Sequence, residues 1–126
     1  MTKVLVVEDE NHIQRLIKIV LEKAGFAVET ASNGEQALQK LHGEDYQPDL
    51  VLLDILMPGI DGLQVLKSIK ENASTTAIPV VMLTALAQEN VVVQGIKLGA
   101  KDYIRKPFHP QALVARVQDI IGKQAS

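Results

Sequence analysis

Three carboxylates of the chain stand where apolar runs end. Asp54 closes the apolar run at 50–53, and Glu8 and Asp9 follow the run at 4–7 in the same manner. Oxygen ligands without His or Cys suit Mg²⁺, which binds few carboxylates and takes a phosphoryl group as a further ligand. Asp54 could equally attack phosphorus as a nucleophile. Since a single acid at such a place can also just cap a helix or face solvent, the interpretation depends on whether the three converge.

Two further polar residues follow the same rule. Thr84 ends a later apolar run, and its hydroxyl could hydrogen-bond a phosphoryl oxygen. Lys106 ends another run and would place a cation against the same anion. Taken alone, either residue is ordinarily structural or on the surface. The joint pattern of acids, hydroxyl and ammonium at successive run ends indicates phosphoryl chemistry.

The elements that must position these residues alternate between strand and helix patterns. Apolar residues recur at helical spacing between the runs, and glycines such as Gly25 and Gly99 end the helices. Asn33 and Asp61 are placed to cap helices. The pattern predicts strands at 3–7, 26–31, 49–54, 78–83 and 100–104, with helices ending at about residues 24, 42, 71 and 98 and a last helix from about residue 110.

Five strand–helix units with short connections predict an α/β fold, a (βα)5 doubly wound, five-stranded parallel sheet of the flavodoxin-like kind. With five strands the expected order is 2-1-3-4-5, in which strands 1 and 3 flank the switch point where such folds bind ligands. Glu8, Asp9 and Asp54 should therefore meet in one crevice.

Composition limits the alternatives. The 126 residues suit a single domain, and the net charge of −2 offers no basic field for nucleic acid. Cys is absent, which excludes disulfides and thiolate metal sites. No stretch approaches the length of a membrane span or a signal peptide, so we expect a soluble, cytoplasmic protein that binds neither DNA nor membranes.

With Glu8, Asp9, Asp54, Thr84 and Lys106 at successive strand ends, the whole chain resembles the receiver domain of two-component response regulators. The resemblance implies one receiver domain over residues 1–126. It implies that this domain is a phosphoacceptor in a phosphorelay and not an enzyme. A histidine kinase, a histidine phosphotransfer protein or a small phosphodonor would phosphorylate Asp54.

The resemblance also implies roles for the other residues. Mg²⁺ would be held by Glu8, Asp9, Asp54 and the backbone carbonyl of Leu56. Thr84 and Lys106 would bind the phosphoryl oxygens. Tyr103 would swing inward when Thr84 moves, changing the face formed by the helix that ends at about residue 98, the strand at 100–104 and the last helix from about residue 110. In this family the peptide bond at Lys106–Pro107 is expected to be cis.

Some positions bear on the lifetime of the phosphoryl group and on the binding of a protein partner. Leu56 and Leu86 are apolar where receivers flank the approach to the phosphoryl group, so we expect them to hinder the attacking water and slow dephosphorylation. The predicted helix that ends at about residue 98 carries Val91, Val92, Val93, Ile96 and Leu98, more apolar residues than one inward stripe requires, which indicates either a protein-binding patch or a deeply placed helix.

A homodimer through the same face is a further possibility. Asp102 and Arg116 match an ion pair used across the dimer face by receivers of winged-helix transcription factors. Val92 and Ala112 stand where that subfamily usually has charges, which weakens the expectation. The three histidines share no metal spacing and are expected to face solvent without a role; they are His12, His42 and His109.

Two other functions fit the topology. An aspartate-based phosphohydrolase of the haloacid dehalogenase type needs a second acid two residues after Asp54, where this chain has Leu56. A flavodoxin-like flavin binder needs a first loop rich in Ser, Thr and Gly to cradle phosphate, whereas this loop is acidic at 8–10. Both fit the residues less well than a receiver domain does.

Overall fold

The computed structural model describes residues 1–43, 46–55, 61–85 and 89–125, with no side chain described for Ala85 or for residues 123–125. Five strands form one sheet in the order β2-β1-β3-β4-β5, and every neighbouring pair is parallel. The predicted fold and strand order are therefore confirmed. The strands are β1 (Lys3–Val7), β2 (Ala27–Ala31), β3 (Leu50–Asp54), β4 (Val80–Ala85) and β5 (Asp102–Lys106).

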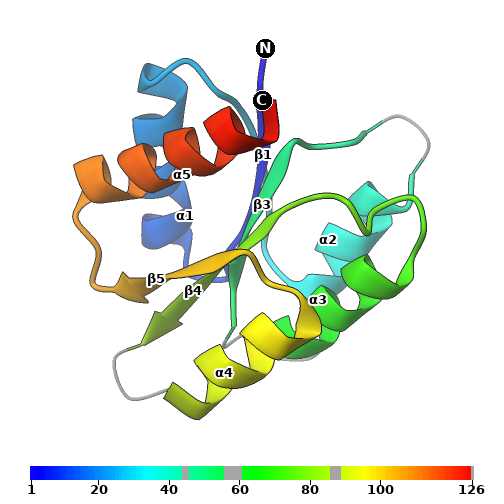
Figure 1. Cartoon of the computed structure of the whole chain (residues 1–126). Helices are drawn as coiled ribbons and strands as arrows, with labels where there is room; N and C mark the ends of the chain where they lie inside the picture. Colours follow the sequence, from blue (N-terminus) through cyan, green and yellow to red (C-terminus); the bar gives the residue numbers. More distant parts are fainter. Residues whose placement is uncertain (44–45, 56–60, 86–88, 126) are drawn as a thin grey trace.

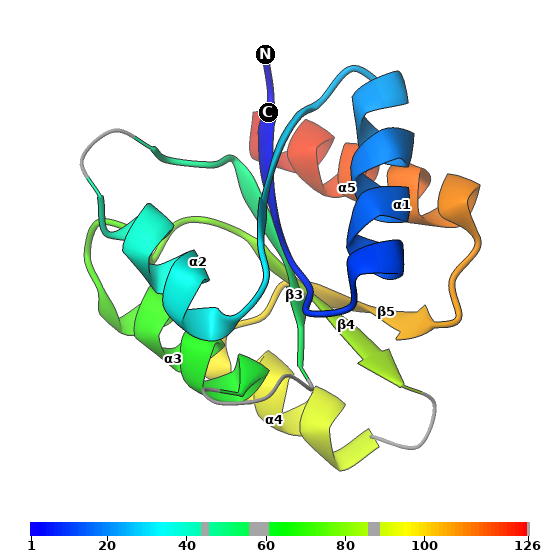
Figure 2. The same ribbon diagram turned by 180° about the vertical axis from the view of Figure 1, so that it is seen from behind.

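Helices cover both faces of this sheet. Figures 1 and 2 show α1 and α5 packed on one face and α2, α3 and α4 on the other. The helices are α1 (Asn11–Lys23), α2 (Gly34–Leu41), α3 (Gly62–Glu71), α4 (Glu89–Leu98) and α5 (Pro110–Ala125). Because neither face of the central strands meets water, these strands are apolar at successive positions and do not alternate with polar residues.

The core divides into two clusters according to the alternation of side chains along each strand. Leu5 and Leu53 belong to the cluster under α2 and α3, whereas Val4 and Leu52 belong to the cluster under α1 and α5. All four side chains are fully buried. The backbone of β1 and β3 is thus fixed on both sides, and so are the residues at the ends of these strands.

Local signals at the helix ends act as the sequence predicts. The Asn33 side chain accepts a hydrogen bond from the backbone N–H of Gln36 at 2.8 Å, and Asp61 forms a capping box with Gln64. Gly25 and Gly99 have positive φ angles of 98° and 113°, which favour glycine after a helix. These caps set where the chain enters and leaves the sheet.

Two strands begin and end later than the sequence indicates. The predictions were 78–83 and 100–104, whereas β4 is Val80–Ala85 and β5 is Asp102–Lys106. The N–H of Ile78 bonds to Thr75 in the preceding turn, and Pro79 has no N–H to give to the sheet. At the far end the ladder continues to the pair Ala85 and Lys106. Thr84 and Lys106 are therefore held by strand pairing and do not lie on loops.

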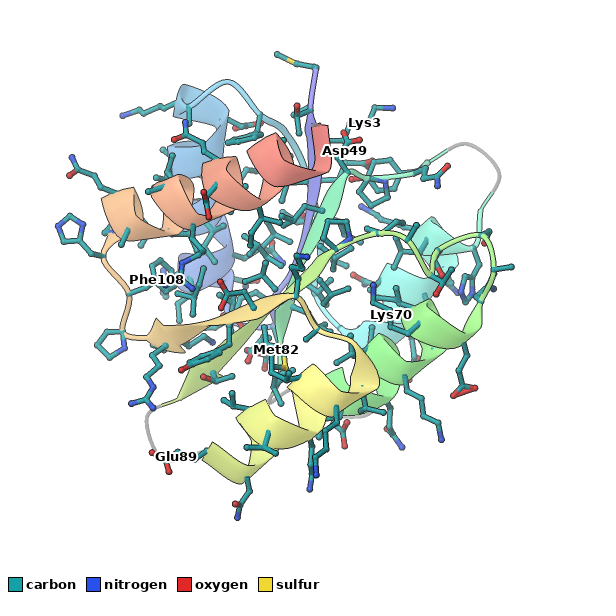
Figure 3. The ribbon with its side chains drawn as sticks, in the orientation of Figure 1. Lys3, Asp49, Lys70, Met82, Glu89 and Phe108 are labelled. Atoms are coloured by element: carbon teal, nitrogen blue, oxygen red, sulfur yellow. The ribbon has the colours of Figure 1, made fainter. Side chains whose placement is uncertain are left out.

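Glycine allows close approach of helices to the sheet at two places. Figure 3 shows Met82 pointing from β4 toward α4, where a Cβ on Gly95 would overlap the Met82 Sδ. At the start of α3, a Cβ on Gly62 would lie 2.5 Å from both the carbonyl oxygen of Asp54 and the Cα of Ile55. The N–H of Gly62 donates to the carbonyl of Ile55 at 3.0 Å. Gly62 therefore lets α3 start directly against the backbone of the β3 end.

Replacing Gly62 with Ala should destabilise the fold, because the added methyl group meets backbone atoms that cannot rotate away. We expect Gly62→Ala to lower the free energy of unfolding by about 1–3 kcal/mol, the usual cost of overpacking. Urea denaturation measures this value. The matched control is Gly122→Ala in α5, where a Cβ meets nothing within 4 Å. Because Ala is the better helix former by up to about 1 kcal/mol, the control should be neutral or stabilising. Equal losses of unfolding free energy in both variants would contradict the contact between Gly62 and the backbone of β3.

Candidate functional site

The structure brings the predicted acids together at the carboxyl edge of the sheet. Glu8, Asp9 and Asp54 each offer one carboxylate oxygen, and these oxygens all lie within 4.8 Å of one another. Glu8 is fully buried, Asp54 is 5% exposed, and Asp9 is exposed to solvent. Because β1 and β3 are neighbours in the sheet, their ends meet at this point. Asp9 is thus the acid of this group that solvent reaches most easily.

One cation bridges the two buried acids. The Nζ atom of Lys106 lies 2.6 Å from Oε1 of Glu8 and 3.1 Å from Oδ2 of Asp54. Lys106 comes from β5, two strands away from β3, and its side chain is 22% exposed. A single ammonium group therefore faces two buried carboxylates, with a third close by. This set lacks positive charge, and a divalent cation would supply it.

The electrostatics of the cluster follow from this imbalance. Burial, reinforced by the neighbouring Asp54 carboxylate, raises the pKa of Glu8 to about 8, although the ammonium of Lys106 acts in the opposite direction. For Lys106, burial alone would lower the pKa, but its hydrogen bonds to the two carboxylates raise it. The lysine is therefore held in its charged form, and without a metal ion the site favours the protonated form of Glu8.

Thr84 carries a hydroxyl group without a partner. The residue is 2% exposed, and its Oγ1 atom has no hydrogen-bond partner among the described residues. Leaving a buried hydroxyl unpaired costs about 1–3 kcal/mol, so such a group calls for an explanation. In the sheet Thr84 pairs with Arg105, next to Lys106. The hydroxyl is therefore available to an additional oxygen at this edge of the sheet.

Tyr103 lies one strand away on the side of α4. Its register partner is Met82, two residues before Thr84 in β4. Tyr103 is half-buried and packs against the core cluster that contains Met82. Its backbone carbonyl accepts a hydrogen bond from Arg116 at 3.2 Å. The structure thus places Tyr103 next to the strand that carries Thr84.

The other predicted features have mixed outcomes. The peptide bond at Lys106–Pro107 is cis, as expected. Leu56, with its backbone carbonyl, and Leu86 lie outside the described residues, so their predicted roles stay predictions. Asp102 and Arg116 form an ion pair at 2.7 Å within the chain itself. The three histidines face solvent, as predicted; they are His12, His42 and His109.

Helix α4 carries an exposed apolar patch, and the alternative that it lies deep is wrong. Val93 is 52% exposed and Ile96 is 45% exposed, while Val91 and Val92 are half-buried. Within the described part of the chain, Gly95 is the only buried residue of this helix. The helix therefore approaches the sheet at Gly95 and packs Val91, Val92 and Leu98 against the core, while Val93 and Ile96 stay exposed.

Two residues near the site were not found from the sequence as parts of it. Gly62 follows the predicted cap residue Asp61 and carries no signal of its own, yet it forms the contact between α3 and the backbone of Asp54. Gln14 was given no role, yet its side chain bonds to the carbonyl of Glu8 at 2.9 Å. A polar residue one turn into the helix after the acidic loop is a weak signal, since such positions usually face solvent.

Comparison with known proteins shows the family to which this chain belongs. The family described as response regulator receiver domain matches residues 4–118. This chain belongs to that family. The receiver domain is 44% identical to the transcriptional regulatory protein ResD of Bacillus subtilis over 122 residues, which are 97% of this chain and 49% of ResD. It is 45% identical over 121 residues to the phosphate regulon transcriptional regulatory protein PhoB of Klebsiella pneumoniae, covering 96% of this chain and 52% of PhoB.

Solved structures agree with this assignment. A response regulator from Chloroflexus aurantiacus superposes with a TM-score of 0.89 at 37% identity, covering 96% of this chain and 98% of the other. A CheY-like receiver domain protein from Methanospirillum hungatei gives a TM-score of 0.91 at 27% identity, covering 99% and 97%. The chain is thus a receiver domain of a two-component response regulator, a signalling domain, and this favours that function over a phosphohydrolase or a flavin binder.

The curated relatives extend beyond the matched region. The receiver domain spans about half the length of ResD and PhoB, whose names describe transcriptional regulators. The expectation that nucleic acid is not bound concerns residues 1–126 alone and stays a prediction. Among the described helices, none has the length and apolar character that a membrane crossing requires.

The raised pKa of Glu8 predicts how stability depends on pH in the metal-free protein. Because the folded state holds the Glu8 proton more tightly than the unfolded chain does, this contribution is complete below about pH 4.5 and is lost as the pH rises through about 8. The free energy of unfolding, measured by urea denaturation in the presence of a chelator, should therefore fall across this window. If the cluster holds Mg²⁺, millimolar concentrations of the ion should oppose the fall, because a bound cation would favour ionised Glu8.

The control for this measurement is a pair of variants in the same loop. Glu8→Gln, which cannot ionise, should flatten the pH dependence between 4.5 and 8. Glu10→Gln changes an exposed acid two residues away and should leave the slope of the wild-type chain in place. An unchanged slope in Glu8→Gln would show that another group titrates.

Proposed function

We propose that this receiver domain accepts a phosphoryl group on Asp54 from the phosphohistidine of a kinase or phosphotransfer protein. The observation that carries the proposal is the bridge from Lys106 to the buried carboxylates of Asp54 and Glu8. The Asp54 carboxylate is 5% exposed and lies beside one ammonium group and two further acids. This set of charges suits the joint binding of a phosphoryl anion and a metal cation. Small phosphodonors would react at the same atom.

The reaction at Asp54 is a direct displacement. A carboxylate oxygen of Asp54 forms a bond to phosphorus while the bond from phosphorus to the donor imidazole nitrogen breaks, and the electron pair of that bond stays on nitrogen. Lys106 stabilises the negative charge that spreads over the phosphoryl oxygens.

Glu8, Asp9, Asp54 and the carbonyl of Leu56 would hold Mg²⁺ at this site. The described part of this donor set fits the ion, because it offers only hard oxygen atoms and has one ammonium for three acids. When bound, Mg²⁺ neutralises phosphoryl oxygens during the transfer. Glu8 must be ionised to act as a ligand, so its proton leaves when the ion enters.

Thr84 and Tyr103 would carry the signal from the site to the surface. The unpaired hydroxyl of Thr84 gains a partner when a phosphoryl oxygen arrives, which favours movement of β4 toward Asp54. The space left beside Thr84 would then admit the ring of Tyr103. This biases a two-state element, the surface formed by α4, β5 and α5.

That surface is where an effector protein or output domain would bind. Val93 and Ile96 of α4 supply exposed apolar area, and the ion pair between Arg105 and Glu89 at 3.8 Å lies at the start of the same helix. A homodimer through this face is the second candidate. For Asp102 and Arg116 to pair across such a dimer, their bond within the chain has to open first, so the effector is the partner that the surface favours.

Phosphorylation at Asp54 can be tested with acetyl phosphate and Mg²⁺, read by intact-protein mass spectrometry. The wild-type chain should gain one phosphoryl group, and Asp54→Asn should gain none because an amide is not a nucleophile of this kind. A chelator should suppress the reaction in the wild-type chain.

The matched control is Asp49→Asn. Asp49 directly precedes β3, at the end of this strand opposite to Asp54. Figure 3 shows Asp49 next to Lys3, and its Oδ2 accepts a hydrogen bond from the Lys3 backbone at 2.8 Å. This variant should be phosphorylated like the wild-type chain. Labelling of Asp54→Asn at the wild-type level would sink the assignment.

The role of Thr84 can be separated from its packing with two threonine variants. Thr84→Val removes a hydroxyl that has no partner among the described residues, so the unfolding free energy should not fall, while the response of α4 to beryllofluoride should be lost. Amide chemical shifts of α4 measure this response. Thr75→Val removes a buried hydroxyl that bonds to the Ile69 carbonyl at 2.7 Å and should cost about 1 kcal/mol without affecting the response. A full α4 response in Thr84→Val would contradict the switch.

A further inference from the structure

Gln14 of α1 joins the ends of two strands through its side-chain amide. The Nε2 atom donates to the backbone carbonyl of Glu8 at 2.9 Å and to that of Ala31 at 3.3 Å. The hydroxyl of Ser32 lies at 3.4 Å, which is at the limit of a hydrogen bond. A side-chain amide has two N–H groups, and the two carbonyls use both.

These bonds hold the peptide that links the first two acids of the cluster. The N–H of Glu8 donates to the carbonyl of Ala31 at 3.0 Å, and the carbonyl of Glu8 accepts from Gln14. The backbone N–H and the backbone carbonyl of Glu8 are therefore both held by hydrogen bonds. The second bond sets the plane of the peptide that joins Glu8 to Asp9. Figure 2 shows how short the link from β1 to α1 is at this edge of the sheet.

Asp9 depends on this restraint more than the other two acids do. Glu8 and Asp54 are buried and bonded to Lys106, whereas Asp9 is exposed in the link between β1 and α1. Its carboxylate nevertheless lies within 4.8 Å of the other two. The orientation of the Glu8–Asp9 peptide decides where that carboxylate points, so a group that fixes this peptide also fixes the third acid of the cluster.

We propose that Gln14 is a positioning residue of the metal site, one that holds the Glu8–Asp9 peptide so that Asp9 completes the cluster for a divalent cation. The inference rests on the proposed function, since it concerns the affinity of the same site for Mg²⁺. A neutral donor serves this purpose without adding a second positive charge next to Lys106. Partners that orient metal ligands typically change metal affinity by about 10- to 100-fold when they are replaced.

The test measures Mg²⁺ binding itself, by isothermal titration calorimetry of the full chain. Gln14→Met keeps the length of the side chain and removes both N–H donors, and it should weaken Mg²⁺ binding about tenfold or more. Phosphorylation by acetyl phosphate should be slow at low Mg²⁺ and recover at saturating Mg²⁺, because the residue acts through affinity. Gln39→Met, an exposed glutamine on α2, is the matched control and should bind Mg²⁺ like the wild-type chain.

The possible outcomes separate this inference from the proposed function. Wild-type affinity in a folded Gln14→Met chain would overturn the inference alone, even if the variant unfolds more easily in urea. A wild-type chain that does not bind Mg²⁺ would overturn the proposed metal site and the inference with it. If Gln14→Met does not fold, Gln14→Asn keeps the amide but is one methylene too short to reach both carbonyls, and the same loss of affinity is expected.

Discussion

The crowding of three carboxylates around one ammonium group is the constraint on which the rest of this structure depends. Lys106 touches both buried acids, at 2.6 Å and 3.1 Å, and no arrangement of a single lysine can neutralise three negative charges. Burial and the neighbouring Asp54 carboxylate raise the pKa of Glu8 to about 8, so without a metal ion the cluster favours a proton on this group. It is suited to function for the same reason, since a divalent cation or a proton can satisfy it but a neutral ligand cannot.

Holding like charges together requires a rigid frame, and the sheet provides it. The central strands β1 and β3 are packed between two helical layers, so their ends cannot move apart to relieve repulsion. Gly62 brings α3 onto the backbone of Asp54, and Gln14 binds the carbonyl of Glu8 from α1. The backbone of both buried acids is thus held by a strand on one side and by the first turn of a helix on the other.

Strand β4 joins this rigid site to a surface that is less firmly held. It carries Thr84, whose hydroxyl has no partner among the described residues, and Met82, which packs against Gly95 of α4. Gly95 is the only fully buried residue of α4 in the described part of the chain, and its other apolar contacts with the core are half-buried, which leaves room for a shift. Chemistry at the site and binding at the surface can therefore be coupled through a few residues of one strand, which is the mechanism that we propose for signalling.

The sequence by itself determined the fold, the strand order and the set of polar residues at the strand ends. It could do so because strands covered on both faces are apolar throughout, and polar residues that interrupt them are visible as exceptions. The tertiary structure alone decided the ends of β4 and β5, since the last ladder pairs depend on a neighbouring strand and not on local preference. It also decided that α4 is exposed and that Asp102 pairs with Arg116 within the chain. Gly62 and Gln14 became recognisable only there, because their roles are contacts with backbone atoms of Asp54 and Glu8, and a backbone contact leaves no pattern in a single sequence.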